Sequence, residues 1–68
     1  MYRVEFQGTN GTEIIGTAND QEGANRLMIA HLNKKGIKPY YFRSWGDEKE
    51  VHVDYGSWSE FYLFVKED

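Results

Sequence analysis

The sequence contains no cysteine and no long apolar run. Without cysteine, neither disulfide bonds nor a cysteine-ligated zinc ion can stabilise the fold, so the core has to come from packed side chains. No apolar stretch approaches the roughly 18 residues that a membrane-spanning helix needs, and residues 1–6 lack a secretory pattern. We therefore expect a cytoplasmic protein without a membrane segment.

The chain also lacks a strong charge of either sign. Eight basic and eleven acidic residues leave a net charge of -3, which argues against a binder held to nucleic acid by electrostatics. At 68 residues the chain is long enough for one small domain, spanning 1–68. Eleven aromatic residues, each of which buries a large area, favour an ordered domain over a disordered chain.

The first part of the sequence predicts a β-hairpin. Residues 2–7 alternate between apolar and polar, which is the period of a half-buried strand. Asn10-Gly11 is a strong hairpin signal, because both residues tolerate the positive φ angles of a type I′ turn. On the second strand, the small Gly16 and Ala18 on the Ile14 side leave room for a helix to lie close.

One helix is expected from Asp20 to Lys35. Asn19, followed three positions later by Glu22, matches a capping box in which two backbone N–H groups are satisfied reciprocally. Gly36 can adopt the left-handed conformation that ends helices, and Pro39 prevents the helix from resuming. The apolar face is expected to comprise Ala24, Leu27, Met28, His31 and Leu32.

Three strands are expected after the helix. Residues 40–45 are rich in aromatic residues that favour strands, and the polar turn 46–49 leads into a return strand, 50–55. The last strand, 60–66, is apolar on both faces, which predicts a central position in the sheet or a covered outer face. The order β-β-α-β-β-β predicts an α+β fold: a two-layer sandwich of an antiparallel sheet with one helix on one face.

One helix covers only one face of a five-stranded sheet, so the other face must meet water or a partner. If Phe61, Leu63 and Val65 face the helix, then Tyr62 and Phe64 face away. The third strand must likewise leave aromatic rings uncovered, either Tyr40 with Phe42 or Tyr41 with Trp45.

These rings could pack on one another to complete a thin core, or they could form a binding face. Tryptophan and tyrosine dominate the hot spots of protein interfaces, and an exposed edge strand could add backbone pairing with a partner. We predict a partner-binding face that comprises Trp45, Trp58, Tyr62, Phe64 and Tyr41. A homodimer through the same face is a close variant, because a twofold contact would bury the surplus aromatic rings.

The alternative is a single-stranded nucleic-acid binder. Bases stack on aromatic rings, and a nearby arginine adds a cation. The stacking platform would comprise Tyr40, Tyr41, Arg43 and Trp45. The net charge disfavours this alternative.

Catalytic and metal chemistry has weak support in the sequence. Glu50, His52 and Asp54 share one strand face and could ligate a metal or orient a general base, but alternating polar residues more simply form a solvated face. His31 lies on the apolar helix face, which predicts a core histidine bonded to a backbone carbonyl or a buried tyrosine hydroxyl. We expect no enzyme activity, no metal and no cofactor.

Residues 54–63 read Asp-Tyr-Gly-Ser-Trp-Ser-Glu-Phe-Tyr-Leu. This run resembles the closing segment of short proteins encoded by phages and prophages of Gram-positive bacteria, which often read Asp-Tyr-Gly-Ser-His followed by an aromatic pair. Those proteins also tend to place an arginine and a tryptophan before the last hairpin, as Arg43 and Trp45 do here. Trp58 stands where that family more often has histidine, so no histidine-dependent site carries over.

The resemblance implies a phage or prophage origin and a bacterial cytoplasmic setting, and it implies no activity. Together with the uncovered aromatic face, it predicts a non-enzymatic accessory protein that binds a host or phage protein, or a second copy of itself.

Overall fold

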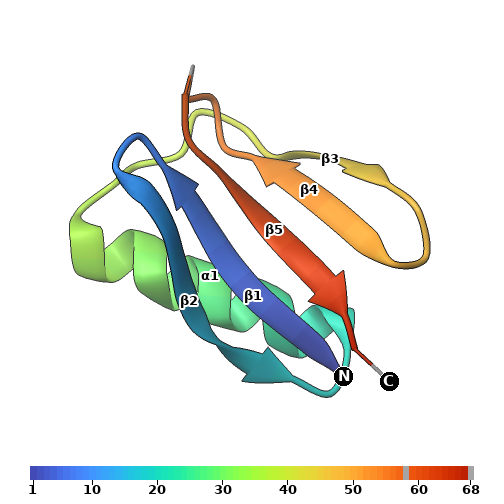
Figure 1. The fold of residues 1–68 in the computed structure, drawn as a ribbon. Coiled ribbons are helices and arrows are strands. Elements are labelled where there is room, and N and C mark those ends of the chain that lie inside the picture. Colours follow the sequence, from blue (N-terminus) through green and yellow to red (C-terminus); the bar gives the residue numbers. More distant parts are fainter. Residues whose placement is uncertain (58, 68) are drawn as a thin grey trace.

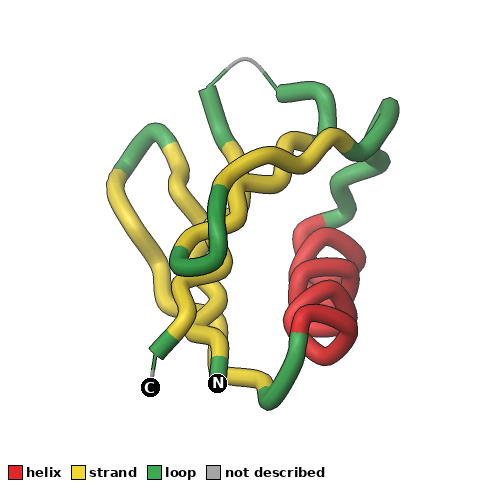
Figure 2. Tube along the Cα trace, turned by 90° about the vertical axis from the view of Figure 1, so that its right-hand side faces the viewer, coloured by secondary structure: helices red, strands yellow, loops and turns green. Residues whose placement is uncertain are grey.

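A computed structural model describes residues 1–57 and 59–67 of the chain. Two layers make up the fold: a five-stranded antiparallel sheet, and one helix that lies across one face of it (Figure 1; Figure 2). The elements follow the predicted order, as β1 (Tyr2–Gly8), β2 (Gly11–Ala18), α1 (Gln21–Lys35), β3 (Arg43–Gly46), β4 (Glu50–Asp54) and β5 (Phe61–Lys66). No helix in the described part of the chain is long and apolar enough to cross a membrane.

The strands lie in the order β2-β1-β5-β4-β3. The last strand therefore takes the centre of the sheet between β1 and β4, which is the first of the two alternatives predicted from its two apolar faces. The edges are β2 and β3. Helix α1 contacts β2, β1 and β5, so it covers the half of the sheet farther from β3.

The alternation along β1 is confirmed, because Val4 and Phe6 are buried toward the helix. Burying large apolar side chains is the main favourable contribution to folding. The core comprises Val4, Phe6, Ala24, Met28, Leu32, Val53, Tyr55, Tyr62 and Phe64.

The helix has the predicted buried face, but its N-cap is Asp20 rather than Asn19. The Asp20 carboxylate accepts the backbone N–H of Gly23 at 2.8 Å. Glu22 does not complete a capping box and instead pairs with Arg26 one turn later, at 2.9 Å. The prediction of Asn19 as the N-cap is therefore wrong, because it rested on the three-residue spacing between Asn19 and Glu22, and Asp is as good an N-cap as Asn.

The end of the helix is as predicted. Gly36 adopts the left-handed conformation at φ 71°, and its N–H donates to the carbonyl of Asn33. The N–H of Ile37 donates to the carbonyl of Leu32 at 3.0 Å, and Ile37 packs against the core. These bonds satisfy carbonyls that a helix end otherwise leaves without partners.

A β-bulge in the first hairpin changes which isoleucine faces the helix. The register shifts after Val4, so Ile14 lies opposite Glu5 on the uncovered face. Ile14 is 63% exposed, whereas Ile15 packs against the core. Gly16 faces the helix as predicted, but a Cβ at that position would lie 3.5 Å from a methyl group of Leu27, an ordinary contact distance that does not require glycine.

The first hairpin forms, but its turn differs from the predicted one. Gly8 pairs with Gly11, so the turn residues are Thr9 and Asn10. Among the described residues only glycines have positive φ, with Gly11 at 122°. The prediction of a type I′ turn centred on Asn10-Gly11 is therefore wrong.

The third strand is shorter than residues 40–45. β3 begins at Arg43, whose partner in β4 is Asp54. Beyond Asp54, Gly56 takes φ 99° and donates its N–H to the Asp54 carboxylate. Because the chain turns away there, residues 41–42 have no strand partner.

Candidate functional site

A row of directly opposed residues crosses all five strands on the face that the helix leaves uncovered. In order it comprises Ile14, Glu5, Leu63, His52 and Trp45. Opposed residues in a sheet lie on the same face. We call this side of the sheet the outer face.

An aromatic stack occupies the β3 end of this row. The Trp45 and His52 rings are nearly parallel, with 5.4 Å between centroids and 9° between planes. His52 also packs against Phe61, again with 5.4 Å between centroids. Although it is held in this stack, Trp45 remains 48% exposed.

Arg43 extends the stack along the strand. Its guanidinium carbon lies 5.5 Å from the Trp45 ring centroid and 5.9 Å from that of Tyr41, at cation–π distances. The guanidinium donates to the Asp54 carboxylate at 2.9 Å. The hydrogen bond from the Gly56 N–H, and to a smaller extent the contact with Arg43, hold the pKa of Asp54 below its usual value. We define the outer cluster as Tyr41, Arg43, Trp45, His52 and Phe61.

The part of the outer face over β1 is polar. Glu5 accepts from Arg3 at 2.7 Å and from Gln7 at 2.8 Å, and Arg3 also pairs with Glu67 at 2.9 Å. Arg3 and Arg43 are thus both bound to carboxylates. The outer face combines an ion-paired half with an aromatic half.

The predicted placement of Tyr62 and Phe64 on the uncovered face is wrong. Tyr62 is fully buried and Phe64 is 2% exposed, both in the core beneath the helix. The opposite side of β5 carries Phe61, Leu63 and Val65, which are only partly buried. A strand that is apolar on both faces gives no signal of its phase, so the sequence pattern could not fix which set faced the helix.

Tyr41 and Trp45 do lie exposed, as the binding-face prediction requires. The prediction for Trp58 lies outside the described residues. Whether any of these residues binds a partner stays a prediction.

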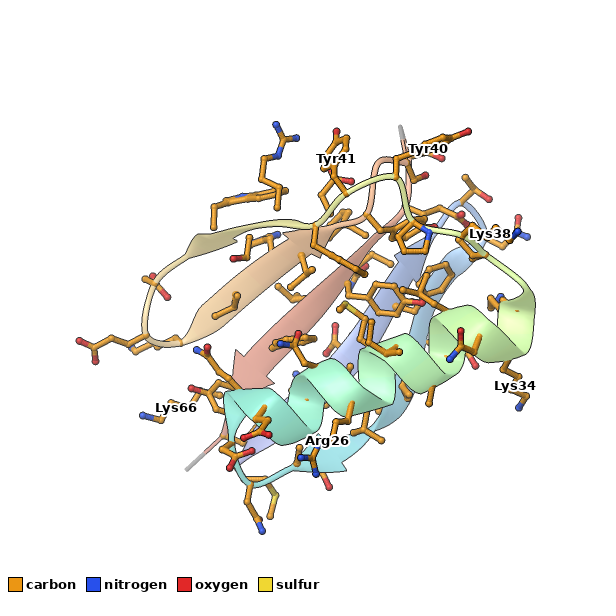
Figure 3. All side chains as sticks on the ribbon, turned by 180° about the vertical axis from the view of Figure 1, so that it is seen from behind. Arg26, Lys34, Lys38, Tyr40, Tyr41 and Lys66 are labelled. Atoms are coloured by element: carbon orange, nitrogen blue, oxygen red, sulfur yellow. The ribbon has the colours of Figure 1, made fainter. Side chains whose placement is uncertain are left out.

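The proposed stacking platform is only partly assembled. Tyr41, Arg43 and Trp45 gather, but Tyr40 is 89% exposed and lies by Tyr55, whose carbonyl accepts its N–H at 3.1 Å. Figure 3 shows the Tyr40 and Tyr41 side chains directed differently from the loop before β3.

The structure does not bring Glu50, His52 and Asp54 together as a metal or catalytic site. His52 lies 4.0 Å from Glu50 and is stacked between rings, and Asp54 is bound to Arg43 and Gly56. Within residues 1–57 and 59–67, no group of three or more such side chains is placed to hold a metal ion.

His31 is a core histidine, as predicted. Its Nδ1 lies 2.7 Å from the Tyr62 hydroxyl and its Nε2 lies 3.4 Å from the Glu13 carboxylate. Burial raises the pKa of Tyr62 well above its usual value. Because His31 and Tyr62 are both buried, their hydrogen bond serves the core and is not presented to a substrate.

Sequence reasoning missed the roles of His52 and Phe61. The hairpin could have revealed His52, since pairing Asp47 with Glu50 across a two-residue loop places Trp45 opposite His52. Phe61 had no comparable signal, because no short turn fixes the register of β5.

Comparison of the chain with protein-family models, with curated proteins and with solved structures gives no match. The geometry of the outer face is therefore the basis for assigning a function to this chain.

Proposed function

We propose that this chain is a non-enzymatic phage or prophage accessory protein that binds a protein partner through the outer cluster. One observation carries the proposal: Trp45 is half exposed, yet His52 and Arg43 hold its ring in place. A pre-ordered aromatic ring loses little conformational entropy on binding, which is typical of interface anchors. The phage setting is supported by the resemblance of residues 54–63.

The charges of the outer face favour a protein over nucleic acid. Arg3 and Arg43 are each bound to carboxylates, and the chain has a net charge of -3. A nucleic-acid strand would have to compete with these carboxylates for its phosphate contacts. The line of Tyr41, Arg43 and Trp45 supports single-stranded nucleic acid as the second candidate.

The test compares two exposed apolar residues at opposite ends of the same row. The immobilised protein is exposed to a lysate of phage-infected Gram-positive cells, and bound proteins are compared for wild type, Trp45→Ala and Ile14→Ala. We expect Trp45→Ala to lose a specifically bound protein that Ile14→Ala retains. Equal retention by both variants would contradict the proposal, and binding of single-stranded DNA that falls steeply with salt would favour the second candidate.

A further inference from the structure

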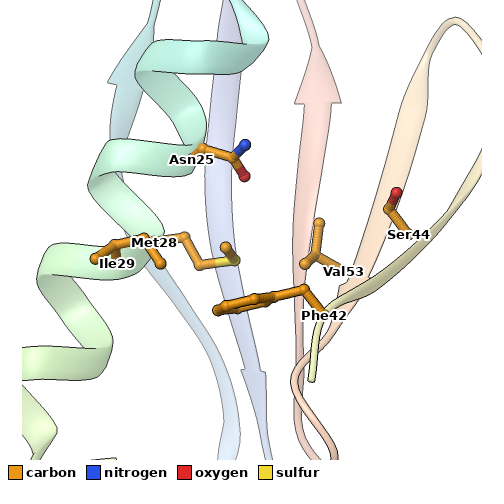
Figure 4. A pocket seen from close by; sticks show the side chains of 6 residues that line it. All are labelled: Asn25, Met28, Ile29, Phe42, Ser44 and Val53. Carbon is orange, nitrogen blue, oxygen red and sulfur yellow. The ribbon is translucent and has the colours of Figure 1, made fainter. Parts of the chain in front are cut away.

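The hairpin β3–β4 leaves a hollow on the helix side of the sheet. The hollow, about 290 Å³ in volume, lies between α1 and β3 and is lined by Asn25, Met28, Ile29, Phe42, Ser44 and Val53. Figure 4 shows Phe42 reaching from the start of β3 toward Met28, with Ser44 and Val53 on the sheet side. Phe42 is 48% exposed and Ile29 40% exposed, so the hollow presents large apolar side chains, beside the polar Asn25 and Ser44, that nothing in the described chain covers.

The free edge of β3 opens onto this hollow. On the helix side β3 presents Ser44, which lies opposite Val53, and Gly46, which lies opposite Val51. The side chain of Ser44 is small, and Gly46 has none. On the β3 side, the hollow is bordered by the Ser44 hydroxymethyl group and the Phe42 ring.

The backbone of Ser44 is oriented for pairing with another strand. Asp47 donates its N–H to the Glu50 carbonyl at 2.9 Å, which makes these two a hydrogen-bonded pair. Bonded and non-bonded pairs alternate along an antiparallel ladder. By this alternation, Trp45 and His52 form the next hydrogen-bonded pair, and Ser44 and Val53 form a non-bonded pair. Ser44 therefore directs its N–H and C=O away from β4, toward the free edge.

We propose that an extended segment of a partner protein adds to β3 as a sixth strand and places a large apolar side chain, opposite Ser44, into this hollow. Directly opposed Cβ atoms in a sheet are about 5 Å apart, so a large side chain at that position reaches over Ser44 toward Val53 and Met28. Its neighbours in the segment point to the outer face and pack beside Trp45 and Arg43. The inference rests on the proposed function and names the form of its partner.

A second copy of this chain fits the hollow poorly. In a twofold pairing of β3 with itself, Ser44 lies opposite Ser44 or Gly46, neither of which fills the hollow. It lies opposite Phe42 only in the register that sets two Arg43 side chains against each other, which is unfavourable. β3 is also only four residues long, so pairing of this edge alone would supply only a small part of the roughly 800 Å² per partner that stable interfaces bury.

The test uses a display library of random decapeptides selected against the full-length protein. Ser44→Pro removes the outward N–H without touching the bonds to β4, as proline is tolerated at such edge positions. Ser44→Phe keeps the N–H and fills the hollow. We expect each variant to weaken the selected peptides by about tenfold or more, since each removes an anchoring contact. Ile14→Ala should bind them as wild type does.

A second measurement does not depend on the variants folding. Methylating the one peptide amide that faces the Ser44 carbonyl should abolish binding to wild type, whereas methylating the next amide, which faces away, should not.

If Trp45→Ala loses the peptides while Ser44→Pro, Ser44→Phe and the methylated peptides bind normally, strand addition is overturned and the proposed function stands. If Trp45→Ala also binds normally, both fail. The proposal that the sixth strand comes from a partner protein is overturned if no peptide is selected. It is also overturned if the protein instead forms a dimer and Ser44→Pro disrupts that dimer.

Discussion

The Trp45 indole stacks on the His52 imidazole, which lies directly opposite it on β4, with planes 9° apart. The contact orders an aromatic ring on the face that the helix does not cover. That pairing underlies the proposed function, because it presents an exposed apolar surface in a fixed orientation.

Truncating Trp45 should separate binding from stability. Trp45→Ala removes one cross-strand aromatic contact from a half-exposed site and should lower the free energy of unfolding by about 1 kcal/mol. Phe64→Ala, in the core, should cost about 3–5 kcal/mol. Urea denaturation of both variants checks this. If Trp45→Ala unfolds the protein as readily as Phe64→Ala, the ring belongs to the core and the site assignment fails.

Several features of the fold follow from local chemistry. The end of the helix at Gly36 can be predicted from the sequence, because glycine readily adopts the left-handed conformation found there. The apolar residues on both faces of β5 predict either a central place or a covered outer face, and the structure has the central place. The burial of His31 with a hydrogen-bond partner follows from its place on an apolar helix face, although the pattern left that partner open between a backbone carbonyl and a buried tyrosine hydroxyl.

Other features depend on long-range register, which local patterns do not encode. A bulge after Val4 moves Ile14 to the outer face, and a one-residue change of phase exchanges the two faces of a strand. The same ambiguity in β5 put Tyr62 on the wrong side. The hollow beside Ser44 arises because helix α1 lies over β2, β1 and β5 and leaves β3 uncovered on that side, and no sequence pattern states which strands the helix covers.

The buried hydroxyl of Tyr62 should matter to stability at neutral pH. Tyr62→Phe leaves the His31 Nδ1 without its partner in the core and should cost about 1–3 kcal/mol. The matched variant Tyr41→Phe removes an exposed hydroxyl and should change little. Urea denaturation at pH 7 distinguishes them, and equal effects would contradict the role of this bond.

Tyr62 should also set part of the alkaline limit of stability. Burial raises the pKa of Tyr62 in the folded state, so above about pH 10 the unfolded chain releases a proton that the folded protein retains. Stability is therefore fully present below that pH and falls as the pH rises. Thermal melts should start at pH 9, about one unit below the usual pKa of tyrosine. From there upward, Tyr62→Phe should lose less stability with rising pH than wild type does. A loss as steep as in wild type would count against this assignment.

Asp54 should contribute to stability at the acid end. The Gly56 N–H and Arg43 lower its pKa, so its contribution is present at neutral pH and lost as the pH falls below about 4. Asp54→Asn should therefore flatten the acid limb of a plot of urea midpoint against pH. The exposed Glu48→Gln serves as the control. An unchanged acid limb in Asp54→Asn would show that the bonds of the Asp54 carboxylate to Gly56 and Arg43 do not contribute to stability at acid pH.

Gly46 should be needed for the hairpin that carries Trp45. It has φ 140°, and a Cβ there would overlap the Glu50 carbonyl oxygen. Gly46→Ala should destabilise the protein by about 1–3 kcal/mol. Gly11→Ala has a similar φ but open space around its Cβ, so it should cost less. Equal losses in thermal melts would mean that the contact with Glu50 relaxes freely.

The most direct test of the central claim is the ¹⁵N spectrum of the Trp45 indole N–H, assigned by comparison with Trp45→Ala. The signal is followed on dilution, on adding single-stranded DNA, and on adding the protein captured from lysate. We predict no change in the first two experiments and a shift in the third. A shift on dilution or with DNA would contradict the account, because the outer cluster would then serve self-association or nucleic-acid binding.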